Sequence, residues 1–422
     1  MNIFRLLVKF LFVFAITVHL FSKISFARNT LNPYIDDSEY ELDIFQNYFH
    51  PDWVFDWETA ENAFRTTGGS LNMRHIYHLQ EAKFRFPLVE NKLWFRYRHD
   101  LEESLVFNSS EDAIELEYLP FANILTSVMM EPHFHKGDID IGYAVAYGVE
   151  EGNRIRLEYH LIDYDKNYAF HDKSVNEGFE EYLNKGPREF KVKINNIKDM
   201  LKFSFNARYQ TPGELRHIEL GSTQEEYIEE FQNWKLGSEL LVDSRAVSPG
   251  LRVDMEGNYK DTAHKPAPMG ADYEIKDKRY LVRPYFIINR QGKVEYFTGC
   301  SLINLYGEKI FHLDHSMDEY YSTKEISPFV FCCYYPFRGS NKHFFDPAIE
   351  FGYMHDSIFE ERKLGAVFFN NTQRENRIRL AVEFVFSEHM RMKIISGWEV
   401  DGEDFDKFSI FDGGYFQFQG VF

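Results

Sequence analysis

The chain has 422 residues, a formal net charge of −19 and an aromatic content of 17%, and its mean hydropathy is −0.42. The acidic charge, which no basic patch interrupts, argues against a nucleic-acid partner. The odd number of cysteines argues against a disulfide framework, although a single bridge from Cys300 to Cys332 or Cys333 stays open. Many aromatic residues in a chain that is polar on average are typical of a wall that separates lipid from water.

Residues 1–27 have the pattern of a secretory signal peptide. Arg5 and Lys9 supply the positive start, and a mostly apolar run from Phe10 to Phe21 follows. The small residues of Ser25-Phe26-Ala27 suit a cleavage site before the mature chain. The alternative is an uncleaved anchor helix, but the run is shorter than the ~20 apolar residues that a span requires.

Residues 28–69 form a segment of different character, because they lack the alternation seen later in the chain. From Tyr40 to Phe55 the apolar residues recur at helical spacing, and we expect Pro51 to end any helix there. We interpret residues 28–69 as a periplasmic lead-in or as a plug inside the fold. A loose N-terminal arm is the alternative.

From about residue 70 the dominant pattern has a period of two, which predicts β-strands. The clearest run, Asp138 to Val149, places its large apolar side chains on one face. These are Ile139, Ile141, Tyr143, Val145, Tyr147 and Val149. A turn signal at Glu151-Gly152-Asn153 and a second alternating run from Arg154 to Leu161 follow, so residues 138–161 are predicted to form a β-hairpin.

The runs are long enough to cross a membrane, which favours a barrel over a soluble sandwich of short strands. After residue 27 the sequence contains no apolar stretch of the length that a membrane helix needs, and only helices and closed barrels can span lipid. We therefore predict an all-β fold, a transmembrane antiparallel β-barrel over residues 70–422. It should have about 16 strands, within a range of about 14 to 18, with short helical insertions at Asn176–Leu183 and Thr223–Trp234.

The end of the chain supplies the most specific motif. It runs from Gly413 to Phe422, places Phe416, Phe418 and Phe422 on one face and stops on an aromatic residue. This resembles the C-terminal signature of Gram-negative outer-membrane β-barrel proteins, but departs from it at Gly420, where an apolar or aromatic residue is usual. The resemblance implies an integral outer-membrane location and implies that the barrel assembly machinery reads these three residues as a targeting signal.

If the C-terminus is periplasmic, the direction of each strand follows. The acidic stretch Asp401–Asp406 and the stretch Asn371–Asn376 are then extracellular loops, and residues 387–389 form a periplasmic turn. The acidic stretch could hold Ca²⁺, but its spacing does not match an EF-hand loop, so a solvated loop is the preferred interpretation.

Charged residues of both signs occupy the alternate positions of the runs and are therefore expected inside the barrel. One interpretation is that they pair across strands to fill a polar interior, and the other is that they line a pore that selects solutes by charge. The pore-lining candidates are Arg96, Arg98, Glu115, Glu117, Asp140, Arg154, Arg156, Glu158, Lys202, Arg208, Arg379 and Glu383.

An acidic insertion could narrow such a pore. The carboxylates of Glu225, Glu226, Glu229 and Glu230 are the candidates for a constriction loop that folds into the lumen and favours cations.

Two clusters of histidines and aspartates are candidates for a metal site or a catalytic site. His133 and His135 with Asp138 and Asp140 could hold a divalent metal, but Pro132 and Gly137 indicate a turn there. Asp138 and Asp140 facing His312 or His315 would loosely resemble the Asp/His sites of omptin-type outer-membrane proteases, whose motifs are otherwise not reproduced. We therefore predict no catalytic residues, no metal and no cofactor, and regard an enzyme as the less favoured class.

The sequence as a whole predicts a porin-like channel that passes small hydrophilic solutes through a charged, polar lumen. Its expected partners are outer-membrane lipid, the barrel assembly machinery and those solutes, whereas its oligomeric state stays open. Two alternatives remain: an export or structural component whose lumen is plugged or filled by a partner, and a hydrolase with its site at the barrel rim.

Overall fold

The computed structural model describes residues 51–422 except for short gaps, which are 72–74, 105–107, 134–137, 149–152, 163–171, 175–178, 199, 220–225, 266–271, 339–345, 388–389 and 401–410. The expected signal peptide, residues 28–50 and the acidic stretch 401–406 lie outside the described residues. Nearly all of the described chain is strand, as the long alternating runs predicted.

The strands form one closed antiparallel ring of 18 strands, with one further strand outside it. In order around the ring they are β1 (Ala63–Leu71), β2 (His75–Val89), β3 (Leu93–Ser104), β4 (Asn108–Phe121), β5 (Ile124–His133), β6 (Asp138–Tyr147), β7 (Asn153–Leu161), β10 (Arg188–Lys198), β11 (Leu201–Gln210), β13 (Glu226–Val242), β14 (Val247–Lys265), β15 (Tyr273–Ile288), β16 (Val294–Phe311), β17 (Glu319–Tyr334), β18 (Asp346–Leu364), β19 (Val367–Ser387), β20 (Met390–Glu399) and β21 (Phe411–Val421).

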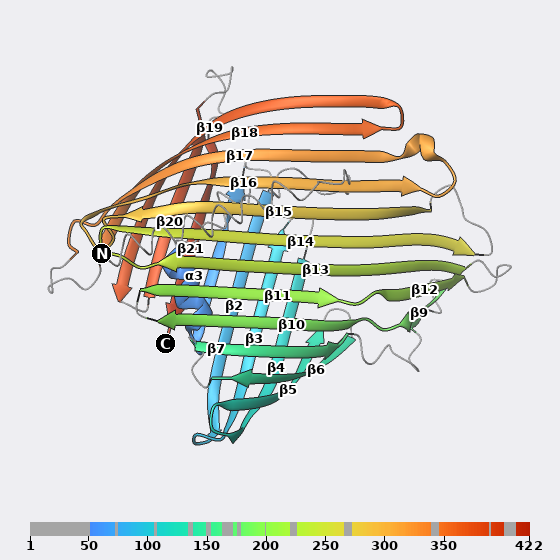
Figure 1. Cartoon of the computed structure of the whole chain (residues 1–422), viewed down its shortest axis with the longest axis horizontal. Helices are drawn as coiled ribbons and strands as arrows, with labels where there is room; N and C mark the ends of the chain where they lie inside the picture. The colour runs from blue at the N-terminus through green and yellow to red at the C-terminus, as the bar shows by residue number, and fades with distance from the viewer. Residues whose placement is uncertain are drawn as a thin grey trace, which may run out of the picture.

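The first and last strands close the ring. Thr66 of β1 lies opposite Gln80 of β2 on one side and opposite Phe418 of β21 on the other. The backbone N–H of Phe422 donates to the carbonyl of Asn62 at 2.9 Å, which ties the last residue to the start of β1 at one mouth of the barrel, here called the terminal mouth. In Figure 1, β13 to β18 cross in front of the steeper β2, β3 and β4.

Two ring strands are interrupted by prolines. The strand β9 (Phe179–Lys185) continues into β10 through Gly186-Pro187, and β11 continues into β12 (Gly213–Glu219) through Thr211-Pro212. Proline cannot donate to a ladder, but the N–H of Thr211 donates to the Arg188 carbonyl at 2.8 Å, so the two strands stay paired at the break. The short β8 (Asp172–Ser174) is the strand outside the ring, paired with β9.

The count of 18 strands corrects the central prediction of about 16. A tight turn interrupts the alternating pattern for only a few residues, so the sequence pattern of two neighbouring strands resembles that of one long strand. At the hairpin of β18 and β19, for example, the chain turns at Gly365, where φ is 55°. The stretch Asn371–Asn376, expected to be a loop, is part of β19.

The described parts of the two predicted helical insertions are strands. Asn176–Leu183 contains the start of β9, and Thr223–Trp234 contains the start of β13. The apolar residues that suggested a helix face serve as cross-strand partners instead: a Cβ at Gly257 would lie 2.5 Å from the Trp234 ring, so that ring covers the glycine. Pairing and packing in the sheet override local helix preference here.

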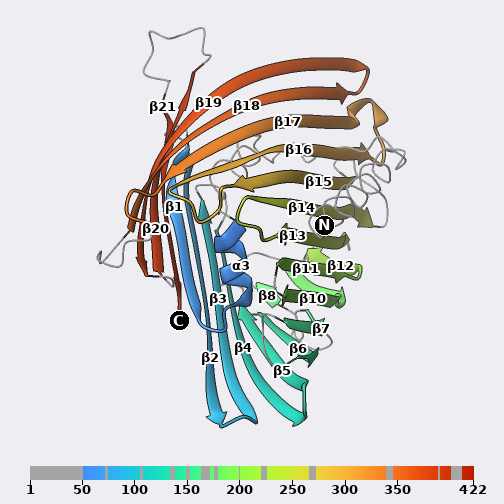
Figure 2. The same cartoon turned by 60° about the vertical axis from the view of Figure 1, so that its left-hand side comes forward.

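Among the described residues, one α-helix forms, α3 (Pro51–Thr59). Pro51 is the first residue of this helix, and proline fits the first helical position because no N–H is required there. The stretch 40–50, where a helix ending at Pro51 was expected, lies outside the described residues. The strand β1 follows at Ala63, so the ring begins ahead of residue 70. Figure 2 shows α3 between β1–β3 on one side and β11 and β13 on the other.

The outer wall of the ring is apolar. On β17 the side chains of Ile326, Val330 and Tyr334 are exposed, whereas the alternate residues Phe329 and Phe331 are buried inside. Other strands repeat the pattern, with exposed Leu157, Tyr296, Phe351, Leu380 and Ile394 among many. Within the part of the chain that the structure describes, no helix is long and apolar enough to cross a membrane.

Candidate functional site

The inner face of β2–β7 and β10 carries a dense network of buried charged side chains, and we call it the charged wall. Its most enclosed carboxylate is Glu117, which is fully buried. The guanidinium of Arg85 lies 2.7 Å from it, Arg154 forms a hydrogen-bonded ion pair with it, and Arg96 and Arg156 each lie 3.8 Å away. A buried charge is tolerated only when it is paired, so Glu117 holds four cationic side chains together.

A second tier of the charged wall is built around Arg156. Its guanidinium lies 2.8 Å from Glu115 and 2.5 Å from Glu158. The Glu158 carboxylate also lies 3.0 Å from Nε2 of the buried His160. Gly142 on the neighbouring strand leaves room for this ring, since a Cβ there would lie 2.7 Å from His160 Nδ1. Side chains from β4 and β7 therefore interlock over Gly142 of β6 on the inner face.

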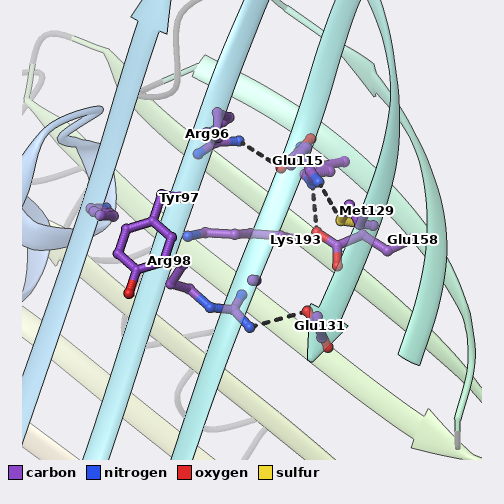
Figure 3. A pocket seen from close by; sticks show the side chains of 11 residues that line it. Arg96, Tyr97, Arg98, Glu115, Met129, Glu131, Glu158 and Lys193 are labelled. Carbon is purple, nitrogen blue, oxygen red and sulfur yellow. Dashed lines mark hydrogen bonds and ion pairs between the residues drawn. The ribbon is translucent and has the colours of Figure 1, made fainter. Parts of the chain in front are cut away.

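A cavity of about 110 Å³ opens beside this tier. Figure 3 shows Arg96 and Arg98 on one strand, reaching toward Glu115 and Glu131 respectively. The distances are 3.6 Å from Arg96 to Glu115 and 3.3 Å from Arg98 to Glu131. The residues that line the cavity are Lys83, Arg96, Tyr97, Arg98, Ala113, Glu115, Met129, Glu131, Arg156, Glu158 and Lys193.

Helix α3 lies inside the barrel and contacts the charged wall through polar groups. Lys193 Nζ lies 2.7 Å from the Glu58 carboxylate, and Asn195 Nδ2 donates to the Glu58 carbonyl at 3.1 Å. Lys83 donates to the Trp57 carbonyl, and the Arg65 guanidinium lies 4.4 Å from the centre of the Trp57 ring. Burial raises the pKa of Glu58, but Lys193, Lys83 and Arg65 outweigh that effect, so its pKa is held below the ordinary value.

The same helix also reaches the other side of the ring. Arg391 of β20 lies 3.1 Å from Asp56, and Gln419 of β21 donates to the Trp53 carbonyl at 3.0 Å. Phe55 is almost completely buried in the main apolar cluster of the molecule. Because these partners belong to separate parts of the ring, α3 spans the lumen near the terminal mouth.

The inner face of β15–β18 differs from the charged wall, and we call it the aromatic wall. The rings of Tyr285 and Phe329 lie 5.2 Å and 5.0 Å from that of Phe297, and Phe331 is 5.5 Å from Phe329. Phe55 of α3 packs into the same cluster. The aromatic wall is thus marked by a cluster of packed rings, although buried charged side chains such as Glu325 and Glu350 lie on the same inner face.

The structure brings eight of the predicted pore-lining residues into the charged wall: Arg96, Arg98, Glu115, Glu117, Asp140, Arg154, Arg156 and Glu158. On β11, Arg208 pairs with Glu189 and Lys202 lies 3.9 Å from Asp243. Arg379 and Glu383 lie instead on β19, next to the aromatic wall. The twelve candidates are thus divided among several places.

Sequence reasoning missed several charged residues of the interior. Arg85, Glu131, His160 and Lys191 belong to the charged wall. The stretch Lys83-Phe-Arg85-Phe already shows alternation that could have identified Arg85. Near the aromatic wall, Glu350 pairs with Arg379 at 2.8 Å and with Lys393 at 2.5 Å.

The predicted constriction loop is not a loop. Glu226, Glu229 and Glu230 belong to the strand β13, and Glu225 lies outside the described residues. Glu229 pairs with Lys260 of the next strand at 2.7 Å. Since these carboxylates are held in the sheet, the cation preference expected from an acidic loop inside the lumen loses its basis.

The histidines weighed for a protease-like site pair with nearby aspartates. His312 Nε2 lies 2.7 Å from Asp261, and His315 Nδ1 lies 3.2 Å from Asp318. His315 belongs to the short helix η1 (His315–Met317), where hydrogen bonds from Ser316 lower the pKa of Asp314. The side chains of His133, His135 and Asp138 lie outside the described residues. The described contacts therefore give His312 and His315 local structural partners.

The C-terminal aromatic residues lie on the outer face of β21. Phe416 and Phe422 are exposed, and the Phe418 ring lies 6.1 Å from Phe64 of β1 across the closing seam. Their reading by the barrel assembly machinery stays a prediction.

A closed ring of long strands with an apolar outer face and charges inside defines an integral outer-membrane β-barrel. No family model matches the chain, and no curated protein matches it.

Several solved outer-membrane proteins match the chain at low sequence identity and low TM-score. A bacterial polysaccharide outer membrane secretin is 8% identical, with 86% of this chain and 99% of that chain covered and a TM-score of 0.38. OmpT of Vibrio cholerae is 12% identical, with 86% and 99% covered and a TM-score of 0.35. OccK10 (OpdN) of Pseudomonas aeruginosa is 8% identical, with 86% and 98% covered and a TM-score of 0.31. Likeness at this level assigns no function to the chain.

Proposed function

We propose that this protein is a channel through which small hydrophilic solutes diffuse across the outer membrane. The observation that carries the proposal is the charged wall, which presents cations and carboxylates along one side of the lumen from Glu131 to Glu117. A barrel of 16 to 18 strands is wide enough to leave an aqueous path. Charged side chains along that path replace part of the hydration of a passing solute.

Helix α3 makes the proposed channel narrow. A helix with its side chains has a diameter of about 10–12 Å, and α3 lies across the lumen with partners on both sides. A cavity beside Arg96 and Arg98 lies along the charged wall and is also lined by Lys193, which contacts α3. The expected conductance is therefore well below that of an unobstructed barrel of this size.

The position of α3 also favours a second candidate, an export or structural component with a plugged lumen. The two candidates differ in whether ions pass while α3 is docked. A channel conducts with α3 in place, whereas a plugged barrel conducts only after α3 is displaced.

Planar-bilayer recording on the purified, folded full chain separates them. We expect small conductance steps from the unaltered protein and larger steps from a double variant, Phe55→Ala with Asp56→Asn, because that variant removes the apolar anchor of α3 and its ion pair with Arg391. The matched control, Met317→Ala with Asp314→Asn, alters the exposed loop between β16 and β17 and should keep the small steps. Steps from the double variant alone would favour the plugged barrel, and silence from all three folded proteins would rule out the channel.

A further inference from the structure

The uncharged band on the outer wall ends at a cation on three strands. On β15 every outward side chain from Ile288 to Tyr280 is uncharged, and the next one is Lys278. On β17 the corresponding run from Tyr334 to Ile326 ends at Lys324, and on β19 the first outward charge is Arg374. The runs on β15 and β17 cover about ten residues each, and a tilted strand of that length rises about 25 Å, the usual height of the lipid-facing band. The three cations therefore mark the border of the band away from the terminal mouth, and we call them the cationic border.

The register of the sheet places the cationic border at one height. Arg374 pairs with Ser357, which pairs with Ile326 on its other side. Lys324 lies two residues beyond Ile326, away from the terminal mouth. The same step, two strands across and two residues further out, leads from Lys324 to Lys278. Because the strands of a closed barrel are tilted, a line of constant height advances by about one residue per strand, and the three cations lie on such a line.

The cations of this border are available to a ligand. The side chains of Lys324 and Arg374 are exposed, and neither takes part in an ion pair among the described contacts. Lys278 is partly exposed and lies within electrostatic range of Glu308, which Lys276 also approaches at 3.6 Å. Lys324 and Arg374 are therefore the two cations that can meet an added anion without giving up a partner.

On the described strands β15–β19, the outward carboxylates lie beyond this border. Glu308 and Glu361 are each two residues further from the band than a cross-strand neighbour of Lys278 or Lys324. At the level of the border, the strands between the cations carry neutral side chains instead, which are Asn304, Tyr306, Ser357 and Phe359. Cations, aromatic rings and small polar groups thus meet at the edge of an apolar surface. Figure 1 shows β15 to β18 side by side in this part of the ring.

We propose that the cationic border binds a phosphorylated glycolipid of the outer leaflet, with Lys324 and Arg374 as its main ligands and Lys278 as a third. The C-terminal motif predicts that the terminal mouth faces the periplasm, which places this border in the outer leaflet. The apolar band below it receives the acyl chains, the cations attract the phosphates, and the aromatic rings lie at the level of the headgroup.

The spacing of the cations favours a phosphorylated sugar headgroup over a phospholipid. Neighbouring cations of the border are two strands apart, which is about 10 Å across the sheet. The single phosphate of a phospholipid meets one cation at a time. A disaccharide with a phosphate at each end meets two at once, which strengthens binding because the second contact is intramolecular. Asn304 and Ser357 lie between the cations and can form hydrogen bonds with sugar hydroxyls.

This inference goes beyond the proposed channel, because it concerns the outer wall and not the lumen. Its test is a titration of the folded full chain in detergent, followed by native mass spectrometry, with diphosphorylated lipid A, phosphatidylglycerol and inorganic phosphate as separate probes. We expect lipid A to bind more tightly than phosphatidylglycerol and inorganic phosphate to bind too weakly to detect. The triple variant Lys278→Gln, Lys324→Gln and Arg374→Gln should weaken lipid A binding by about 100-fold, since each cation near an anionic lipid surface contributes about fivefold.

A matched control removes the same charge from the opposite border. Lys92, Arg245 and Lys293 are exposed in turns at the terminal mouth, and their triple replacement by glutamine should leave lipid A binding unchanged. The single variants Lys324→Gln and Arg374→Gln should each lower the affinity by about fivefold. Lipid A binding should also weaken as salt is added, because these charges are exposed.

Three results would overturn the inference: no binding of lipid A to the folded protein, the same affinity in the border variant and the control variant, or binding of phosphatidylglycerol as tight as that of lipid A. The last result would make the border a general anionic-lipid contact. Conductance does not enter any of these outcomes, so a silent barrel that binds lipid A refutes the channel alone, and a conducting barrel that does not bind it refutes the lipid site alone.

Discussion

The charged wall and the aromatic wall face the same lumen but are held together in different ways. On the charged wall, one buried carboxylate, Glu117, is shared by Arg85, Arg96, Arg154 and Arg156. On the aromatic wall, apolar rings pack against one another and against α3. Burial of rings is favourable wherever shapes fit, whereas burial of charge is tolerated only while every partner is present.

The difference indicates which wall can serve a solute. The rings of the aromatic wall pack against one another and contribute mainly rigidity. The charged wall offers donors and acceptors that can exchange partners. Helix α3 joins the two, with Phe55 in the apolar cluster and Glu58 on the charged side. Its position therefore couples the packing of one wall to the width of the path along the other.

The largest effect should come from removing the shared carboxylate. Glu117→Ala leaves four guanidinium groups close together without their common partner, and removing one member of a buried ion pair costs about 3–5 kcal/mol. Urea unfolding of the folded protein in lipid vesicles measures the change. Glu256→Ala is the control, since its pairs with Lys235 and Arg279 are partly exposed and should contribute no more than about 1 kcal/mol. Similar losses for the two variants would remove the distinction drawn for the charged wall.

On the aromatic wall the sensitive property is volume. A Cβ at Gly352 would lie 2.2 Å from the Phe331 ring, so Gly352→Ala forces that ring to move. Overpacking of this kind lowers the free energy of unfolding by about 1–3 kcal/mol. The same urea unfolding measures the change.

The control for this prediction is Gly420→Ala in the closing strand. There the added Cβ would lie 3.1 Å from the tip of the Phe422 side chain, which is exposed and can shift. The free energy of unfolding should fall by no more than about 0.5 kcal/mol. If Gly352→Ala were equally mild, the aromatic wall would be loosely packed rather than rigid.

Helix α3 links the two walls, and the stability of its docking on the charged wall should depend on pH. The pKa of Glu58 is lowered by Lys193, Lys83 and Arg65 against the opposing effect of burial. A carboxyl group with a lowered pKa stabilises the docked helix above its unfolded pKa of about 4.3, and that stabilisation is lost as the pH falls toward the lowered value.

Bilayer recording can follow this effect. Conductance steps should grow when the pH is lowered from 7 into the range below about 4, because α3 loses its anchor on the charged wall. Glu58→Gln should show the larger steps already at pH 7 and should not respond to acid through this residue. Steps in the unaltered protein that stay constant down to the onset of unfolding would show that Glu58 does not hold α3.

Much of the fold follows from alternation in the sequence. The predicted hairpin of residues 138–161 is confirmed, with Val145 opposite Leu157 across β6 and β7. Alternation says which face a residue takes but not where a strand ends at a tight turn, so the strand number was underestimated. It also fails where aromatic residues fall by chance at helical spacing, as from Tyr227 to Trp234.

For the charged wall, the sequence predicts which single residues face inward but not which of them pair with one another. The inward positions of Glu115 and Arg156 follow from their own strands, but their contact joins β4 to β7, which are not neighbours in the ring. Such contacts depend on the curvature and shear of the closed barrel, which no local pattern encodes. The place of α3 inside the lumen is a long-range property of the same kind.

The smallest effect is expected where a buried carboxylate has partners to spare. Glu350 pairs with Arg379 and Lys393, and the Cys333 thiol also donates to it at 3.3 Å. Cys333→Ala removes only the weak donor and should cost about 0.5–1.5 kcal/mol in urea unfolding. Cys300→Ala, whose thiol has no charged partner among the described contacts, is the control and should cost less. A loss for Cys333→Ala as large as that for Glu117→Ala would show that carboxylates on both walls depend on every partner, and the contrast between the walls would then lie in their rings alone.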